Sequence, residues 1–230
     1  DDQRVFQEGR LAYAQQVALI PSSGVDTKRF CPNPERAAGE RFRVVMAARL
    51  LRSKGVAEFA AAAERLRHDG VAVDCVLAGA PDPGNPDSMD PVVVRRWADE
   101  GILDWQGHND DIATLFRNAD AVVLPSYYGE GLPRSLIEGG ACGLPLITTD
   151  RPGCRDVVSH GVEGLIVPER DFLALADAIR RLAGDREESA RFGMAARNKV
   201  LMHFDERIII ERTLAIYRAL LPGFESLQPA

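Results

Sequence analysis

The sequence predicts an α/β domain in which helices cover both faces of a parallel β-sheet. From Arg41 onward, short apolar segments alternate with segments whose apolar residues recur at helical spacing. The short segments are continuously apolar, which indicates strands buried on both faces, and such strands are typical of parallel sheets with crossover helices. These two observations favour the Rossmann-like class.

The pattern also bounds each element. Strands are predicted at Phe42–Ala47, Val73–Ala78, Ile102–Trp105, Ala121–Leu124, Leu146–Thr148 and Leu165–Val167. Helices are predicted at Val56–Arg67, Asp90–Glu100, Ile112–Asn118, Pro133–Cys142, Cys154–Val158, Phe172–Leu182, Glu187–Leu201 and Glu206–Leu221. The segment Ala80–Asp90 is rich in Pro, Gly, Asp and Asn, so we expect a loop there.

The residues before the first strand differ in composition from the alternating part. Gln3–Gln16 has helical spacing, Val17–Ile20 suggests a short strand, and Pro21–Arg41 is rich in Pro, Gly and charge. Such a segment is typical of a domain connection. We therefore expect an interdomain connection with a remnant of an N-terminal domain at 1–40, a Rossmann-like ligand-binding domain at 41–205, and a C-terminal helix and tail at 206–230.

The composition limits the classes of function. Of 230 residues, 46% are hydrophobic and 27% are charged, which is typical of globular proteins with a substantial core. No apolar run approaches the ~20 residues that a membrane-spanning helix needs. The formal net charge of -6 argues against a nucleic-acid partner, because binding phosphate backbones requires a clustered positive face.

The cysteines and histidines show no spacing typical of a metal site or a disulfide framework. They are Cys31, Cys75, Cys142 and Cys154, and His68, His108, His160 and His203. Reduced thiols favour a cytoplasmic protein, and we expect no metal. The chain begins at Asp1 without an initiator methionine or a signal peptide, which suggests a fragment of a longer protein.

A basic turn follows the first predicted strand and contains Arg49 and Lys54. Ligands of open parallel sheets bind at the carboxyl ends of the strands, where helix N-termini point at them. An arginine fork, a lysine charge and backbone N–H groups would together hold an anion. On its own, an ordinary solvated basic turn is an equal alternative.

Two acids follow the fourth predicted strand. Glu130 lies in a glycine-containing loop, and Glu138 lies about two turns into the next helix, up to ~12 Å away. They are too far apart to share a proton, so they would contact different parts of one extended ligand, as acceptors for sugar hydroxyls. Taken alone, ordinary charges at the start and on the surface of a helix are the more common explanation.

Taken together, these motifs resemble those of the retaining GT-B glycosyltransferases, the large sucrose synthase-like and mannosyltransferase-like family. Glu130 and Glu138, with Gly-Leu-Pro after the first, are similar to its Glu-x7-Glu motif, and Arg49 with Lys54 is similar to its Arg-x4-Lys pair. Further resemblances lie at 20–30, 141–145 and 161–167. The resemblance covers nearly all of the chain and implies the C-terminal half of a GT-B fold.

Some positions depart from the family pattern. Gly139 and Gly140 replace the alanine-like residues that are usual after the second Glu. Each helix glycine costs ~1 kcal/mol, so we expect them to admit close packing. Arg155 and Asp156 stand where a Glu is common, so that family contact is not carried over to this chain.

The resemblance implies a role for each matched residue. Arg49 and Lys54 would neutralise the diphosphate of a UDP- or GDP-sugar and stabilise the leaving nucleotide, and Glu130 would bind hydroxyls of the transferred sugar. These are the candidate catalytic residues, and no metal cofactor is implied. The candidate binding residues are Glu138 for the ribose, Gly131 and Leu132 for sugar and phosphate, and Gly107, His108 and Ile112 for the base.

The resemblance further implies that the sugar is transferred with retention to a glycan or a lipid-linked acceptor, as in surface polysaccharide or lipopolysaccharide synthesis. The acceptor would bind to an N-terminal domain that this chain lacks, so the isolated fragment should transfer little or nothing. The complete protein would be cytoplasmic or would associate peripherally with the inner face of the membrane. The alternatives are a nucleotide-sugar epimerase or hydrolase of the same architecture, or a non-catalytic nucleotide-sugar-binding module.

Overall fold

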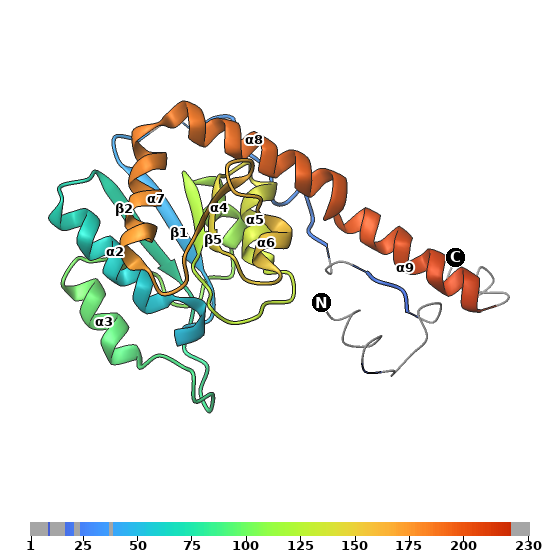
Figure 1. Cartoon of the computed structure of the whole chain (residues 1–230), viewed down its shortest axis with the longest axis horizontal. Helices are drawn as coiled ribbons and strands as arrows, with labels where there is room; N and C mark the ends of the chain where they lie inside the picture. Colours follow the sequence, from blue (N-terminus) through green and yellow to red (C-terminus); the bar gives the residue numbers. More distant parts are fainter. Residues whose placement is uncertain (1–8, 10–16, 21–23, 37–38, 222–230) are drawn as a thin grey trace.

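The sheet is built from the apolar segments that the sequence predicts as strands, and its strands pair in parallel (Figure 1). The structure is a computed structural model that describes residues 9, 17–20, 24–36 and 39–221. The strands are β1 (Phe42–Ala47), β2 (Val73–Ala78), β3 (Asp104–Trp105), β4 (Ala121–Leu124), β5 (Leu146–Thr149) and β6 (Gly164–Val167). Their order is β3-β2-β1-β4-β5-β6, so the direction of winding reverses between β1 and β4.

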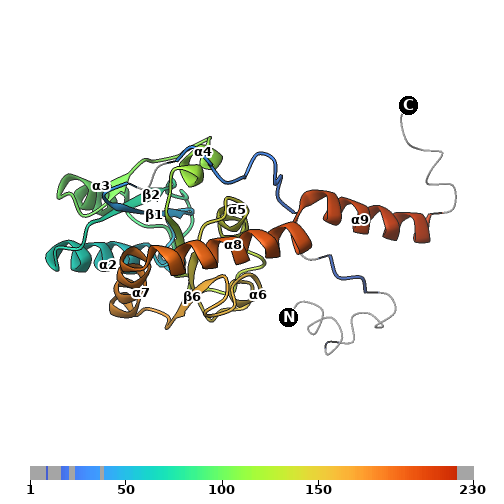
Figure 2. The ribbon, with the colours of Figure 1, turned by 90° about the horizontal axis from the view of Figure 1, so that it is seen from above.

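Helices connect the strands and cover both faces of the sheet. They are η2 (Arg52–Lys54), α2 (Val56–His68), α3 (Pro91–Asp99), α4 (Ile112–Arg117), α5 (Arg134–Ala141), α6 (Cys154–Val157), α7 (Phe172–Gly184), α8 (Arg186–His203) and α9 (Glu206–Leu220). Figure 2 shows α4 on one side of β1, and α2 with α7 on the other. Helix α2 packs against α7, and α5 packs against β4 and α8. The predicted Rossmann-like class is therefore confirmed.

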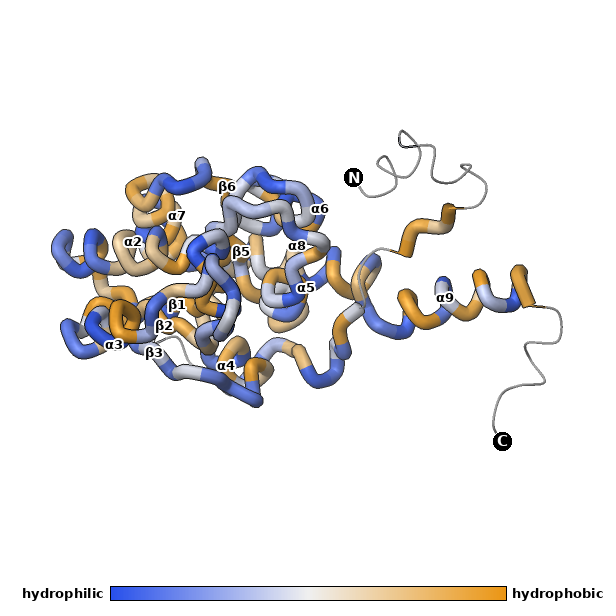
Figure 3. The backbone as a smooth tube through the Cα atoms, turned by 90° about the horizontal axis from the view of Figure 1, so that it is seen from below, coloured by the Kyte–Doolittle hydropathy of each residue, from blue (hydrophilic) through white to orange (hydrophobic). Residues whose placement is uncertain are grey.

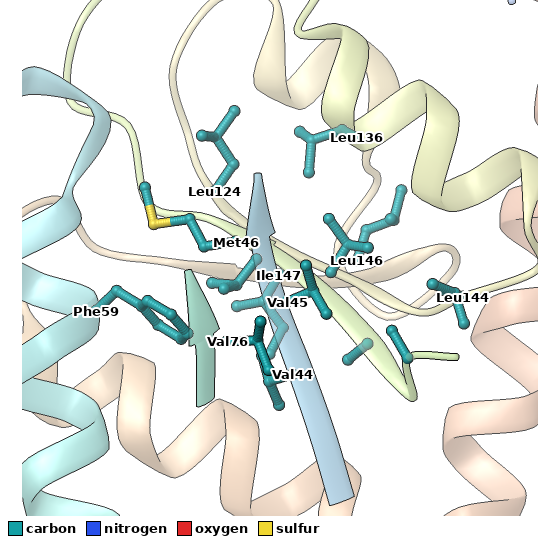
Figure 4. Close-up of a cluster of buried hydrophobic side chains, with 14 of the residues drawn as sticks. Val44, Val45, Met46, Phe59, Val76, Leu124, Leu136, Leu144, Leu146 and Ile147 are labelled. Carbon is teal, nitrogen blue, oxygen red and sulfur yellow. The ribbon is translucent and has the colours of Figure 1, made fainter. Parts of the chain in front are cut away.

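The core lies where the central strands meet the helices (Figure 4). Val44 and Met46 of β1 and Ile147 of β5 are fully buried. Phe59 of α2 and Leu136 of α5 are also fully buried in this cluster. Burial on both faces explains why these strands are continuously apolar in sequence.

The third strand is shorter than the predicted segment Ile102–Trp105. Ile102 and Leu103 are buried, but the N–H of Ile102 donates to the carbonyl of Trp97 in α3 at 2.9 Å. Only Asp104–Trp105 pairs with β2. The apolar character of the first two residues therefore reflects packing of the connection rather than sheet pairing.

The prediction of a strand at Val17–Ile20 is wrong. These residues have no strand conformation, and Leu19 is 63% exposed. A strand requires a neighbour for its backbone N–H and C=O groups, and the pairing in the described sheet involves only β1 to β6. The predicted helix at Gln3–Gln16, apart from Gly9, and the tail at 222–230 lie outside the described residues.

The segment 24–36 is fastened to the junction between α8 and α9. Val25 exchanges backbone hydrogen bonds with residues on both sides of this junction. The hydroxyl of Thr27 donates to the buried carboxylate of Asp205 at 2.5 Å. Hydrogen bonds from Arg207, and then from Thr27, hold the pKa of Asp205 well below its ordinary value. The carboxylate of Asp205 also accepts a hydrogen bond from the backbone N–H of Arg207 in α9. Asp205 therefore connects this segment to the start of α9.

Helix α9 projects away from the sheet domain and alternates between apolar and polar residues (Figures 1 and 3). Ile209 near its start is buried, whereas Ile210, Tyr217 and Leu220 are exposed. None of the helices in the described part of the chain combines the length and apolar character of a membrane span. The far part of α9 thus presents apolar side chains to its surroundings.

The two glycines of α5 allow close packing on both sides of this helix, as the sequence led us to expect. A Cβ atom at Gly139 would lie 2.6 Å from a methyl carbon of Val122 in β4. A Cβ atom at Gly140 would lie 3.1 Å from a methyl carbon of Val200 in α8. The loss of helix propensity therefore accompanies a closer approach of α5 to the sheet and to α8.

We expect Gly139→Ala to lower the free energy of unfolding. Overpacking against the rigid side chain of Val122 costs about 1–3 kcal/mol, and the better helix propensity of alanine returns at most about 1 kcal/mol. Urea unfolding followed by circular dichroism would measure the difference. Gly184→Ala at the end of α7 is the control, because apart from the neighbouring residues and backbone of its own helix no atom lies within 4 Å of a Cβ there. Equal stability of the two variants would contradict the packing argument.

Candidate functional site

A cavity of about 520 Å³ opens at the carboxyl ends of β1, β2 and β4, beside the point where the strand order reverses. Its lining comes from the turn after β1, the loop after β2, the start of α4, and the loop after β4 with the beginning of α5. This is the place where parallel α/β sheets bind ligands, and the volume suits a small organic molecule.

Most of the residues predicted from the sequence line this cavity. They are Arg49, Lys54, His108, Ile112, Glu130, Leu132 and Glu138. Gly107 and Gly131 are neighbours of lining residues in the same loops but are not part of the lining. Residues that lie up to 89 positions apart, from Arg49 to Glu138, thus meet at one edge of the sheet.

Glycines allow the loops of the site to approach one another. Gly55 has φ +81° and ends η2 where α2 begins. A Cβ there would lie 2.3 Å from the carbonyl oxygen of Pro125, directly after β4. A Cβ at Gly79, after β2, would lie 1.8 Å from the carbonyl oxygen of Ala48. Side chains at these positions would push apart the turns that line the cavity.

Lys54 and Glu130, which both line the cavity, form an ion pair. The Lys54 ammonium donates to both carboxylate oxygens of Glu130, at 2.5 and 2.6 Å. The side chains are only 17% and 10% exposed. The hydroxyl of buried Ser126 donates to the same carboxylate at 2.8 Å. The position of the Glu130 carboxylate is therefore fixed by a charge and by a buried hydroxyl.

Sequence reasoning missed Ser126 as a site residue, although it belongs to the same loop. Its backbone carbonyl accepts a hydrogen bond from the hydroxyl of Thr149 at the end of β5. The feature of the sequence that could have identified Ser126 is a polar residue that follows closely after an apolar strand. The geometry of Ser126 suits the orientation of a neighbouring carboxylate.

Arg49 lies at a more open part of the cavity and is paired with Asp82. Its Nη1 donates to Asp82 Oδ2 at 2.6 Å, and the side chains are 64% and 30% exposed. Asp82 belongs to the segment that the sequence predicts only as a loop, so its contribution to the cavity was missed. An acid shortly after the end of β2 was the available signal.

Glu138 is the fifth residue of α5, which begins at Arg134, so it lies little more than one turn into the helix and not two turns as expected from the sequence. Its side chain is 14% exposed, and Arg134 lies 3.3 Å from its carboxylate. Burial raises the pKa of Glu138, and the charge of Arg134 partly offsets this effect. The carboxylate is thus held at the cavity wall, beside an exposed guanidinium of the same helix.

The loop before α4 forms another wall of the cavity. His108 lies 3.0 Å from the carboxylate of Asp110, and both side chains are exposed. The carbonyl of Gly107 accepts a hydrogen bond from the N–H of Gly79 at 2.7 Å, which holds this loop against the end of β2. Ile112 is the first residue of α4 and contributes an apolar side chain.

The buried cysteines contribute no reactive thiol to the cavity. Burial raises the pKa of Cys75 and of Cys142 to about 12, and that of Cys154 to about 11. A thiol with such a pKa is protonated at neutral pH and is a poor nucleophile. Among the described residues, no cluster of His, Cys, Asp and Glu has the geometry of a metal site.

Breaking the Lys54–Glu130 pair should destabilise the fold. Lys54→Met or Glu130→Gln leaves the partner charge in a poorly solvated site, so each should lower the free energy of unfolding by about 2–4 kcal/mol. The double variant should cost less than the sum, as measured by a double-mutant cycle in urea. The exposed Arg41–Asp74 pair is the control, with a coupling below about 1 kcal/mol. Additive costs for Lys54 and Glu130 would contradict the buried pairing.

Comparison with known proteins connects this geometry to a family. Residues 28–199 match the family of glycosyl transferases group 1. An α-1,3-N-acetylgalactosaminyltransferase of Campylobacter jejuni, whose name also specifies N,N'-diacetylbacillosaminyl-diphospho-undecaprenol, is 31% identical over 88% of this chain and 54% of that protein. Glycogen synthase of Mycobacterium tuberculosis is 31% identical over 90% of this chain and 50% of that protein. The amylovoran biosynthesis glycosyltransferase AmsK of Erwinia amylovora is 26% identical over 87% and 50%.

Solved structures share the fold. Sucrose-phosphate synthase from Thermosynechococcus elongatus superimposes with a TM-score of 0.81 and 27% identity, over 96% of this chain and 57% of that one. Anabaena HepE, solved in complex with UDP, gives a TM-score of 0.81 and 23% identity, over 95% and 61%. The chain spans about half the length of the curated relatives that it matches. It is a Rossmann-like half of a GT-B fold, and it belongs to the glycosyl transferases group 1 family.

Proposed function

We propose that this chain binds a UDP- or GDP-sugar and is the donor-binding part of a retaining glycosyltransferase. One observation carries the proposal: the cations Arg49 and Lys54 line the same cavity as the carboxylates Glu130 and Glu138, and Asp82 and Arg134 line it as well. A nucleoside diphosphate sugar has a negative centre between two hydroxyl-bearing sugars, so it needs cations flanked by acceptors.

The proposed pose follows from the position of each group. The diphosphate lies at the turn after β1, within reach of Arg49 and Lys54. Glu138 on α5 accepts the ribose hydroxyls, and the base lies against the wall formed by His108 and Ile112, with Gly107 close by. The transferred sugar contacts Glu130, with the backbone of Gly131 and Leu132 nearby. UDP is a sensible first ligand because HepE, which has the same fold, was solved with it.

In this proposal, cationic side chains do the work that a metal does in other phosphate sites. Arg49 and Lys54 stabilise the charge that develops on the leaving diphosphate, and removing one such preorganised group typically costs about 2.7–4 kcal/mol of barrier. The transferred sugar and the incoming hydroxyl meet on the same face, and the departing phosphate helps to deprotonate that hydroxyl. The high pKa values of the buried Cys142 and Cys154 make them unsuitable as covalent nucleophiles.

The acceptor is proposed to bind to sequence outside this chain. The chain covers 54% of the Campylobacter jejuni relative, whose name specifies a diphospho-undecaprenol compound, and 50% of AmsK, whose name specifies amylovoran biosynthesis. A glycan or lipid-linked acceptor in surface polysaccharide or lipopolysaccharide assembly is therefore our proposal. The exposed apolar residues of α9 would face that further part of the protein, which would lie in the cytoplasm or peripherally at the membrane.

Donor binding can be tested on the chain itself. Ligand-observed NMR with UDP-, GDP- and ADP-sugars should give signals for UDP- or GDP-sugars, and Arg49→Ala should weaken binding by about 10-fold or more because a charge-assisted contact is lost. Binding of the free nucleoside should change little. Arg41→Ala, just before β1, is the control. Absence of a binding signal for every nucleotide sugar in the panel would contradict the donor-site proposal.

The stereochemical outcome can be tested on the complete protein. With a matching acceptor, the new glycosidic bond should have the anomeric configuration of the donor, as read from the anomeric proton coupling in NMR spectra of the product. The isolated chain should bind the donor but transfer little or no sugar. An inverted product would contradict retention, and efficient transfer by the isolated chain would contradict the proposed division of labour. Free epimerised or hydrolysed sugar would favour the epimerase or hydrolase instead.

A further inference from the structure

The loop between β2 and α3, residues 80–90, is built onto the turn that carries Arg49 and Lys54. The backbone N–H of Leu50 donates to the carbonyl oxygen of Ala80 at 3.0 Å. The backbone N–H of Met89 donates to the carbonyl oxygen of Leu50 at 2.7 Å. The N–H of Ser53 donates to the carboxylate of Asp87 at 3.1 Å. This loop, which we call the β2–α3 loop, is therefore held in a fixed position beside the proposed phosphate site.

Within this loop, Asp82 points its carboxylate at Arg49. The side chain of Asn85 donates to Asp82 Oδ2 at 3.1 Å, which orients the same oxygen that accepts from Arg49 at 2.6 Å. The backbone N–H of Asp82 donates to the hydroxyl of Ser88 at 3.0 Å. The carboxylate is thus positioned by contacts within its own loop, and the Arg49 guanidinium meets it at the cavity wall.

We infer that Asp82 competes with the phosphates of the donor for Arg49 and thereby lowers donor affinity. This inference rests on the proposed function of the same cavity. A carboxylate presents to a guanidinium the same kind of acceptor oxygens as a phosphate. A diphosphate that reached Arg49 would also approach the negative charge of Asp82, so binding requires Arg49 to exchange one anion for another.

Arg49 and Lys54, the two cations proposed to bind the diphosphate, differ in how easily they can make this exchange. Lys54 is paired with Glu130, and that pair is only 17% and 10% exposed and is reinforced by Ser126. The Arg49–Asp82 pair is 64% and 30% exposed, and exposed pairs of this kind contribute little. Arg49 is therefore the cation that exchanges its partner for the donor phosphates more easily, and the strength of its pairing with Asp82 determines how much affinity this exchange loses.

The isosteric variant Asp82→Asn tests this inference in the chain itself. UDP and uridine, and in parallel GDP and guanosine, are titrated by calorimetry or NMR. We expect the variant to bind the diphosphate about 1.5- to 5-fold more tightly than the wild type, which is the factor that corresponds to an exposed ion pair. Binding of the nucleoside should not change, because it has no phosphate to compete. The gain should shrink at high salt.

Two controls separate competition from a general change in charge. Asp74→Asn removes an exposed acid that is paired with Arg41 outside the cavity, and it should leave UDP and GDP affinity unchanged. In an Arg49→Ala background, Asp82→Asn should give a smaller gain than in the wild-type background, because the group that both anions share is gone and only the direct repulsion by Asp82 is relieved.

Each remaining outcome decides against the inference. If Asp82→Asn leaves diphosphate affinity unchanged while the wild type binds, the inference fails and the proposed function stands. If the variant binds the diphosphate more weakly, Asp82 positions Arg49 rather than competing for it. If Asp82→Asn raises diphosphate affinity equally in the wild-type and Arg49→Ala backgrounds, the effect comes from the overall change in charge and not from competition for Arg49. If neither wild type nor variant binds UDP or GDP, the proposed function fails and the inference fails with it.

Discussion

The site depends on the parallel pairing of β1 with β4 at the centre of the sheet. These strands are neighbours in space although β2 and β3 lie between them in sequence, so the winding of the chain reverses there and the loops that follow them diverge. That divergence opens the cavity at the carboxyl edge. Gly55 then lets the turn after β1 rest against Pro125, which follows β4. The meeting of Lys54 and Glu130 is a consequence of this backbone arrangement.

The charged side chains of the site are paired with one another. Lys54 has Glu130, Arg49 has Asp82, and Arg134 lies beside Glu138. These pairs differ in solvation, and solvation decides how strongly each is held. The buried Lys54–Glu130 pair is a fixed structural element of the cavity, whereas the exposed pair with Asp82 can be exchanged. A site of this kind can bind an anionic ligand, and its cations keep carboxylate partners when no ligand is bound.

The sequence was sufficient to predict what depends on local pattern. Strands β1, β2 and β4 have the predicted bounds because they are buried on both faces, and the residues after them lie at the predicted edge. Val17–Ile20 is apolar but has no neighbouring strand among the described residues, which a local pattern cannot reveal. Asp82 and Ser126 were missed for a related reason: their importance comes from the partners Arg49 and Glu130, and those contacts exist only after the loops are assembled.

The packing of α5 links the stability of the fold to the geometry of the site. Glu138 is followed immediately by Gly139, which lies against Val122 of β4, and by Gly140, which lies against α8. Because these glycines let the helix approach both neighbours, they set how far α5 stands from the sheet and therefore where Glu138 meets the cavity. A helix with alanine at these positions would be intrinsically better formed, yet it would carry the carboxylate away from the strand edge. The departure from the family pattern thus acts on the position of a proposed binding residue.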